Sequence, residues 1–95
     1  EKWRKSPKLC THHIVAKKDH RANDTREIVK KYVPNIVTDE RNLVRIKERF
    51  HHKLHRNIYF TFQYLCFKPL DGNKTKVLNM LKTQKIIISI VNYTA

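Results

Sequence analysis

The chain has 95 residues, which is enough for one compact domain and too few for two. It carries 21 Lys and Arg against 8 Asp and Glu, a net charge of +13 with neutral histidines. This excess favours a polyanionic partner, most commonly nucleic acid. The single glycine, Gly72, excludes a P-loop, and no G-x-S-x-G nucleophile elbow is present. The longest strongly apolar run, residues 86–91, is far shorter than the roughly 20 residues that span a bilayer.

Two cysteines, Cys10 and Cys66, are too far apart for a C-x-x-C metal knuckle and too few for a disulfide scaffold. They fit a protein that works in a reducing compartment. The chain begins at Glu1 and holds one methionine, Met80, far from its start. We therefore expect it to be a piece of a longer protein.

The N-terminal third is predicted to form a strand and then a helix. Residues 1–9 are charged and show no period, so we expect a linker or arm before a single domain over 10–95. The stretch "LCTHHIVA" mixes β-branched and apolar residues, which indicates a strand near Cys10. Asp19 could cap a helix that ends before Pro34, since a residue preceding proline avoids the α region.

The middle of the chain switches from a strand period to a helix period. Residues 34–42 read as a loop, and "NLVRIK" at 42–47 alternates apolar and polar positions, as a half-buried strand does. The two strands could pair as a hairpin. From Glu48 apolar residues recur every three or four positions up to Cys66, which predicts one helix about four turns long.

The C-terminal third is less regular. Residues 68–74 contain Gly72 and predict a turn, and "TKVLNMLKTQ" at 75–84 predicts a second, shorter helix. The run "KIIISIVNY" at 85–93 has strand character, but its place in the fold does not follow from the sequence.

Histidines gather on the predicted long helix. His51, His55 and Tyr59 are four residues apart and would form a column beside the apolar stripe. Imidazoles one turn apart can bind one metal ion, with each nitrogen about 2.0–2.1 Å from the metal. His52 could replace His51 as the partner of His55 at spacing i, i+3. A solvated polar helix face would show the same pattern.

A second cluster, His12 and His13, lies on the first predicted strand, where neighbouring side chains point to opposite faces. If His12 joins His51 and His55 as a third ligand, a fourth position stays open for water or phosphate, as in catalytic sites. His13 would then be free to act as a general base, since imidazole titrates near neutral pH. Two half-buried polar residues near a strand end remain the alternative.

The order of these residues resembles the HNH, or ββα-metal, nuclease superfamily, in particular its AHH branch of bacterial polymorphic toxin domains. The matching segments are "HHIVAKKDHRANDTREIV" and "NLVRIKERFHHKLHRNIYF", which include the spacing Asn-x8-His-x3-His. The resemblance covers residues 11–60, a little over half of the chain. Thr11 stands at the alanine of the AHH motif, and the C-terminal third is not covered.

The resemblance implies an α+β fold, with a small ββα-metal core over 10–66, a helix inserted between the two strands and additional C-terminal elements. It implies that the metal ligands are His12, His51 and His55, with His51 chosen over His52. It also implies that His13 is the general base and that Asn42 orients it through hydrogen bonds. Further residues are expected to contact nucleic acid, with salt bridges an open alternative for the first two: Arg21, Arg26, Arg45, Lys47 and Tyr59.

The function implied is a metal-dependent endonuclease that acts on DNA, with RNA left open, and leaves a 5′-phosphate and a 3′-hydroxyl. Three imidazoles suit Zn²⁺ or Ni²⁺, whereas a phosphate-bridged site could turn over better with Mg²⁺ or Mn²⁺. The family context implies the toxin domain of a larger secreted protein used in contact-dependent growth inhibition. Such a toxin would act in the target-cell cytoplasm and be neutralised by an acidic immunity protein.

Two other classes of protein stay open. One is a zinc-stabilised module that binds nucleic acid without catalysis. The other is a basic adaptor whose histidines are incidental and bind no metal in fixed ratio.

Overall fold

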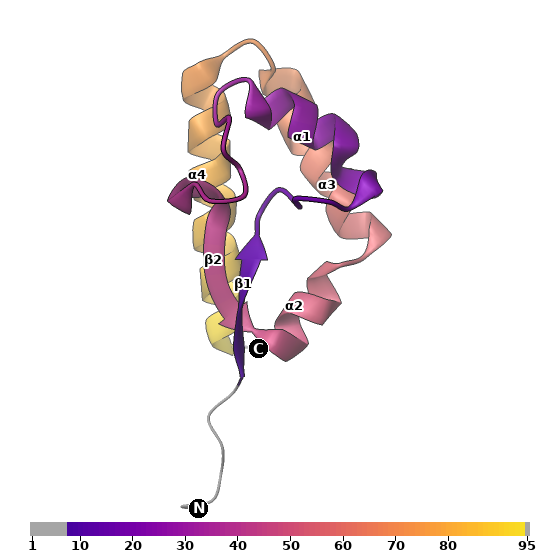
Figure 1. Ribbon diagram of the computed structural model, residues 1–95, viewed down its shortest axis with the longest axis vertical. Helices are drawn as coiled ribbons and strands as arrows, with labels where there is room; N and C mark the ends of the chain where they lie inside the picture. Colours follow the sequence, from indigo (N-terminus) through magenta and orange to yellow (C-terminus); the bar gives the residue numbers. More distant parts are fainter. Residues whose placement is uncertain (1–7, 95) are drawn as a thin grey trace, which may run out of the picture.

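The computed structural model describes residues 8–94, so most of the predicted arm, residues 1–7, lies outside the described part. The fold is α+β, as predicted, with helix α1 inserted between the two strands (Figure 1). Its elements in chain order are β1 (Leu9–His13), the 3₁₀ turn η1 (His20–Ala22), α1 (Asn23–Lys30), the 3₁₀ turn η2 (Glu40–Asn42), β2 (Leu43–Lys47), α2 (Glu48–Leu54), α3 (Asn57–Phe67), the 3₁₀ turn η3 (Lys68–Leu70) and α4 (Lys74–Thr94).

The two strands pair antiparallel, from Leu9 opposite Lys47 to His13 opposite Leu43. The first strand is shorter than the predicted stretch, because after His13 the chain turns to bond with Asn42. The residues that follow, Ile14 and Val15, are nevertheless fully buried. The segment therefore belongs to the core although it is not strand.

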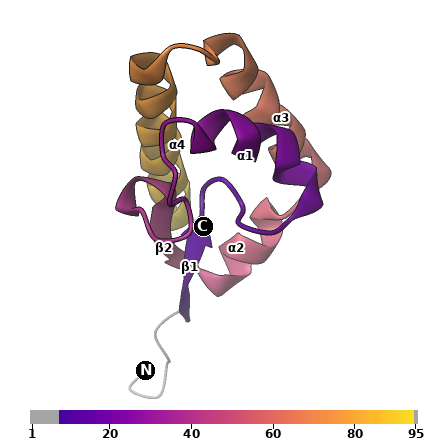
Figure 2. The same ribbon diagram turned by 45° about the horizontal axis from the view of Figure 1, so that its top comes forward.

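The core lies between the strands and the helices. Helix α4 packs against β2, and α1 and α3 lie side by side in both views (Figures 1 and 2). Burying one large apolar side chain stabilises a fold by roughly 1.5–3 kcal/mol. The fully buried members of this core include Ile14, Val15, Val29, Val33, Ile46, Phe67, Val77 and Leu81.

The long helix predicted from Glu48 is wrong in one respect, because the structure divides it into α2 and α3. His55 has φ −78° and ψ 64°, and the Arg56 N–H donates to the Leu54 carbonyl at 2.8 Å. These values describe an inverse γ-turn. The chain changes direction at one of the predicted metal ligands, so Tyr59 lies on a different helix from His51.

The direction of α3 is held by contacts with a residue distant in the chain, which spacing along the helix does not reveal. Arg21 Nη1 donates to Asn57 Oδ1 at 2.8 Å, and its guanidinium lies 4.4 Å from the centre of the Phe60 ring. Asn57 and Phe60 belong to the first turn of α3. The start of α3 is therefore fixed by a residue from η1.

The predicted C-terminal strand is also wrong, because residues 74–94 form a single helix, α4. The β-branched run suggested a strand, but β-propensity depends strongly on tertiary context. Buried positions recur at helical spacing across both predicted segments, at Val77, Leu81, Gln84 and Ile88. Near the end of α4, Asn92 Oδ1 accepts a hydrogen bond from the Lys47 N–H at 2.7 Å. Among residues 8–94, no helix combines the length and apolar character needed to cross a membrane.

Helix α4 should therefore be essential for stability. We expect Leu81→Ala to lower the free energy of unfolding by about 2–5 kcal/mol, because it opens a cavity at a fully buried position. The exposed Ile90 on the same helix provides a control, and Ile90→Ala should change this free energy by no more than about 0.5 kcal/mol. Urea unfolding followed by circular dichroism measures both free energies. If Leu81→Ala lowers the free energy of unfolding as little as Ile90→Ala, α4 lies outside the cooperative fold.

Candidate metal centre

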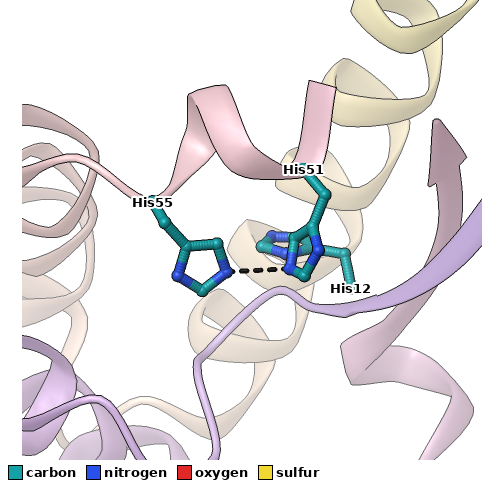
Figure 3. Close-up of side chains that lie close together, drawn as sticks. All are labelled: His12, His51 and His55. Carbon is teal, nitrogen blue, oxygen red and sulfur yellow. Dashed lines mark hydrogen bonds between the residues drawn. The ribbon is translucent and has the colours of Figure 1, made fainter. Parts of the chain in front are cut away.

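Three histidines from two parts of the chain meet in one place. His12 comes from β1, His51 from α2, and His55 directly follows α2 (Figure 3). One ring nitrogen of each lies within 4.8 Å of those of the other two. The Nε2 atoms of His51 and His55 are 2.8 Å apart, so the inverse γ-turn does not separate this pair. The three residues predicted as ligands are thus brought together and could hold one metal ion.

His52, the alternative partner in the sequence, is not in this group. Its side chain is exposed, and its ring lies beside that of His51 with centroids 6.2 Å apart. By contrast, the ring centroids of His51 are 4.5 Å from His55 and 5.0 Å from His12. The geometry favours His51.

Hydrogen bonds determine which nitrogen of His12 has a free lone pair. The Tyr59 hydroxyl donates to the Ile14 carbonyl at 2.8 Å, so its oxygen accepts from His12 Nε2 at 3.2 Å. Burial raises the pKa of Tyr59, which keeps the hydroxyl protonated. His12 Nε2 therefore carries the hydrogen and Nδ1 the lone pair. His12 Nδ1 is buried without a hydrogen-bond partner in the described chain, and a metal ion would satisfy this atom.

Cys10 contacts the ring of His51, the second predicted ligand. Cys10 Sγ lies 3.2 Å from His51 Nδ1. If His51 Nε2 binds a metal, Nδ1 carries the hydrogen and donates it to this sulfur. This contact was not predicted from the sequence, although strand alternation places Cys10 and His12 on the same face of β1.

The electrostatic environment keeps the cluster neutral. Burial lowers the pKa of His12 to about 3, and repulsion by neighbouring histidine charges adds to the shift. Burial also lowers the pKa of His51 and of His55. Metals bind the deprotonated imidazole, so the three side chains are in their binding form at neutral pH. This donor set fits a divalent transition metal.

His13 leaves β1 on the face opposite to His12, but it borders the same surface hollow as His51 and His55. The hollow has a volume of about 360 Å³ and is lined by Thr11, His13, Ala16, Lys17, Lys18, Asp19, His51 and His55. His13 Nε2 lies 3.0 Å from the Val37 carbonyl oxygen, which can only accept. Nε2 thus carries a hydrogen, and in the neutral ring Nδ1 has the lone pair.

Asn42 connects the segments around His13 and is fully buried. Its Oδ1 accepts from the Val15 N–H at 2.7 Å, and its Nδ2 donates to the carbonyls of Val15 at 3.1 Å and Ile36 at 2.8 Å. Ile36 directly precedes Val37, which binds His13. The asparagine therefore joins the end of β1 to the loop that holds the His13 ring.

Three of the residues predicted to contact nucleic acid make polar contacts with other groups of the protein. Arg21 bonds to both Asp19 oxygens, at 3.0 and 2.8 Å, and the tip of Tyr59 faces His12. Arg26 donates to the Ala16 carbonyl and to the side chain of Asn23. Arg21 thus forms a salt bridge with Asp19, and Arg26 bonds to the backbone.

The other two predicted nucleic-acid contacts lie on β2. Arg45 is exposed on this strand and Lys47 is half-buried at its end.

Asp19, predicted as a helix cap, accepts the Arg21 N–H at 2.9 Å at the start of η1. The same Arg21 side chain lowers the pKa of Asp19.

The model of a nuclease family of the HNH/ENDO VII superfamily with conserved AHH matches residues 1–82. The chain belongs to this AHH family. The match reaches beyond the motif-bearing residues 11–60 into α4, and it includes the segment Thr11, His12 and His13. No curated protein and no solved structure matches the chain. Membership makes this AHH domain a nuclease with a nucleic-acid substrate.

We expect the AHH domain to bind one divalent transition metal per chain through the three histidines. His51→Ala should weaken binding by more than the roughly 10–100-fold that loss of a supporting hydrogen bond costs, because it removes a ligand. His52→Ala, at the neighbouring exposed position, should leave the affinity unchanged. Isothermal titration with Zn²⁺ or Ni²⁺ measures both, and weaker binding by the His52 variant alone would reverse the choice between the two.

The Tyr59 hydroxyl should act on metal affinity through His12. We expect Tyr59→Phe to weaken binding by roughly 10–100-fold, since it removes the acceptor of the Nε2 hydrogen while keeping the ring. Tyr64→Phe is the matched control, because the Tyr64 hydroxyl bonds to Lys68 rather than to a histidine. The same titration decides, and equal affinities for the two variants would remove Tyr59 from the site.

Proposed function

We propose that the AHH domain is a metal-dependent endonuclease that cleaves DNA, with His13 as its general base. The observation that carries this proposal is the hollow, which His13 shares with His51 and His55. A scissile phosphate near these two histidines would lie next to a group that can take up a proton. RNA, the other polymer with this backbone, remains the second substrate to test.

The residues have separate tasks in this mechanism. The Val37 carbonyl holds the Nε2 hydrogen of His13, so Nδ1 is the atom that accepts a proton from the attacking water. Asn42 keeps that carbonyl in place by holding the preceding residue, Ile36. The base is thereby oriented before the substrate binds, which saves the cost of ordering it during the reaction.

His12, His51 and His55 would hold the metal ion. A divalent metal bound there supplies Lewis acidity, which stabilises negative charge on the scissile phosphate and on the departing oxygen. Neutral imidazoles suit Zn²⁺ or Ni²⁺ for tight binding, and Mg²⁺ or Mn²⁺ could support turnover. The supporting contacts of Tyr59 and Cys10 orient two of the three rings.

We further propose that the domain is the toxin part of a larger secreted bacterial protein, delivered into the cytoplasm of a target cell during contact-dependent growth inhibition. The resemblance of its motifs to polymorphic toxin domains supports this role. A producing cell would need an immunity protein. The net charge of +13 favours an acidic one, because complementary charge speeds association and improves specificity.

A zinc-stabilised binding module without catalysis is the alternative function. It would use the same three histidines to hold the fold and the same positive charge to bind nucleic acid. It differs in one respect, since His13 would have no chemical task. A His13 variant therefore separates the two functions.

We expect His13→Ala to lower the rate of supercoiled-plasmid cleavage by roughly 10²–10⁴-fold, the usual contribution of a general base. His20→Ala changes an exposed histidine that does not line the hollow, and it should cleave at the wild-type rate. Both variants are assayed with EDTA and after adding Zn²⁺, Ni²⁺, Mg²⁺ or Mn²⁺, and circular dichroism checks their fold. Undiminished cleavage by a folded His13 variant would refute the assignment. Plasmid left intact under every metal would direct the assay to RNA and, if RNA also survives, favour the binding module.

A further inference from the structure

Two lysines that belong to no predicted site border the hollow. Lys17 and Lys18 line it together with His13, His51 and His55, and both are exposed. Neither makes a hydrogen bond or an ion pair within residues 8–94. Their charges are therefore available to a ligand that enters the hollow.

The two residues that directly precede these lysines are held in place by hydrogen bonds. Asn42 bonds to both the N–H and the carbonyl of Val15, and Arg26 donates to the carbonyl of Ala16. Val15 and Ala16 are themselves buried. The lysines thus extend from an ordered segment, which lowers the entropy lost when they bind a ligand.

The local charge is positive. Among the described residues that line the hollow, the one acidic side chain is Asp19, which is paired with Arg21 through two side-chain hydrogen bonds of 3.0 and 2.8 Å. This pairing neutralises the carboxylate and also occupies the guanidinium of Arg21. Within the part of the chain that the structure describes, Lys17 and Lys18 are left as unpaired cations that line the same hollow as the histidines.

We propose that Lys17 and Lys18 bind backbone phosphates of the nucleic acid that flank the cleaved bond. This inference rests on the proposed function, which places the scissile phosphate in the hollow. Lysine binds phosphate as a point charge, without the planar geometry that arginine needs. The guanidinium groups of Arg21 and Arg26, by contrast, already bond to groups of the protein itself.

The test measures how binding to a fluorescently labelled DNA duplex depends on salt, with EDTA present to prevent cleavage. Each lost duplex phosphate contact should lower the slope of log K against log salt by about 0.9, so Lys17→Ala/Lys18→Ala should lower it by about 1.8. Lys74→Ala/Lys76→Ala removes the same charge from exposed positions at the start of α4, outside the hollow, and should lower the slope less. Circular dichroism checks the fold of both variants.

Equal slopes for the two double variants would overturn the inference, since the lysines would then act only through total charge. Plasmid cleavage by the wild-type domain tests the proposed function separately. If the wild type cleaves and the two slopes are equal, the lysine contacts fail while the nuclease stands. If no polymer is cleaved under any metal but the Lys17 and Lys18 variant still loses the larger slope, the phosphate contacts stand and their position beside a cleaved bond is refuted.

Discussion

The buried amide of Asn42 is the constraint on which the site depends. An amide removed from water is costly unless its hydrogen bonds are made, and here it makes three with the backbone. They join the segment after β1 to the loop before η2, and the Asn42 carbonyl adds a fourth bond by accepting from the Ile14 N–H. Since Val37 in that loop holds His13, the position of the proposed base follows from this one residue.

Strand alternation then separates the two histidines of the doublet. His12 pairs with Val44 and His13 with Leu43, so their side chains leave β1 on opposite faces. His12 is 1% exposed and belongs to the cluster of three histidines, whereas His13 is half-buried and borders the hollow. A shift of one residue in the pairing would exchange these environments, and the bonds of Asn42 oppose such a shift.

The sequence was sufficient for features that depend on short spacings. His12 comes from a strand distant in the chain, and its grouping with His51 and His55 was implied by the resemblance to the AHH family. The pair His51 and His55 itself depends only on spacing along the helix and was predictable. The break at His55 was not, because it depends on contacts of α3 with Arg21, which is distant in the chain. The helical state of residues 85–93 was missed for the same reason, since packing on β2 overrides the β-propensity of the isoleucines.

The C-terminal helix reaches the metal centre through buried amides. Gln84 Oε1 accepts from Gln63 Nε2 at 3.0 Å, and the same nitrogen lies 2.6 Å from the Ile14 carbonyl and 3.3 Å from the Tyr59 hydroxyl. Tyr59 in turn accepts from His12. Burying two glutamines is costly, and Gln63 Oε1 and Gln84 Nε2 have no partner in the described chain. Through Tyr59 and Gln63, a residue of α4 thus supports the ligand from β1.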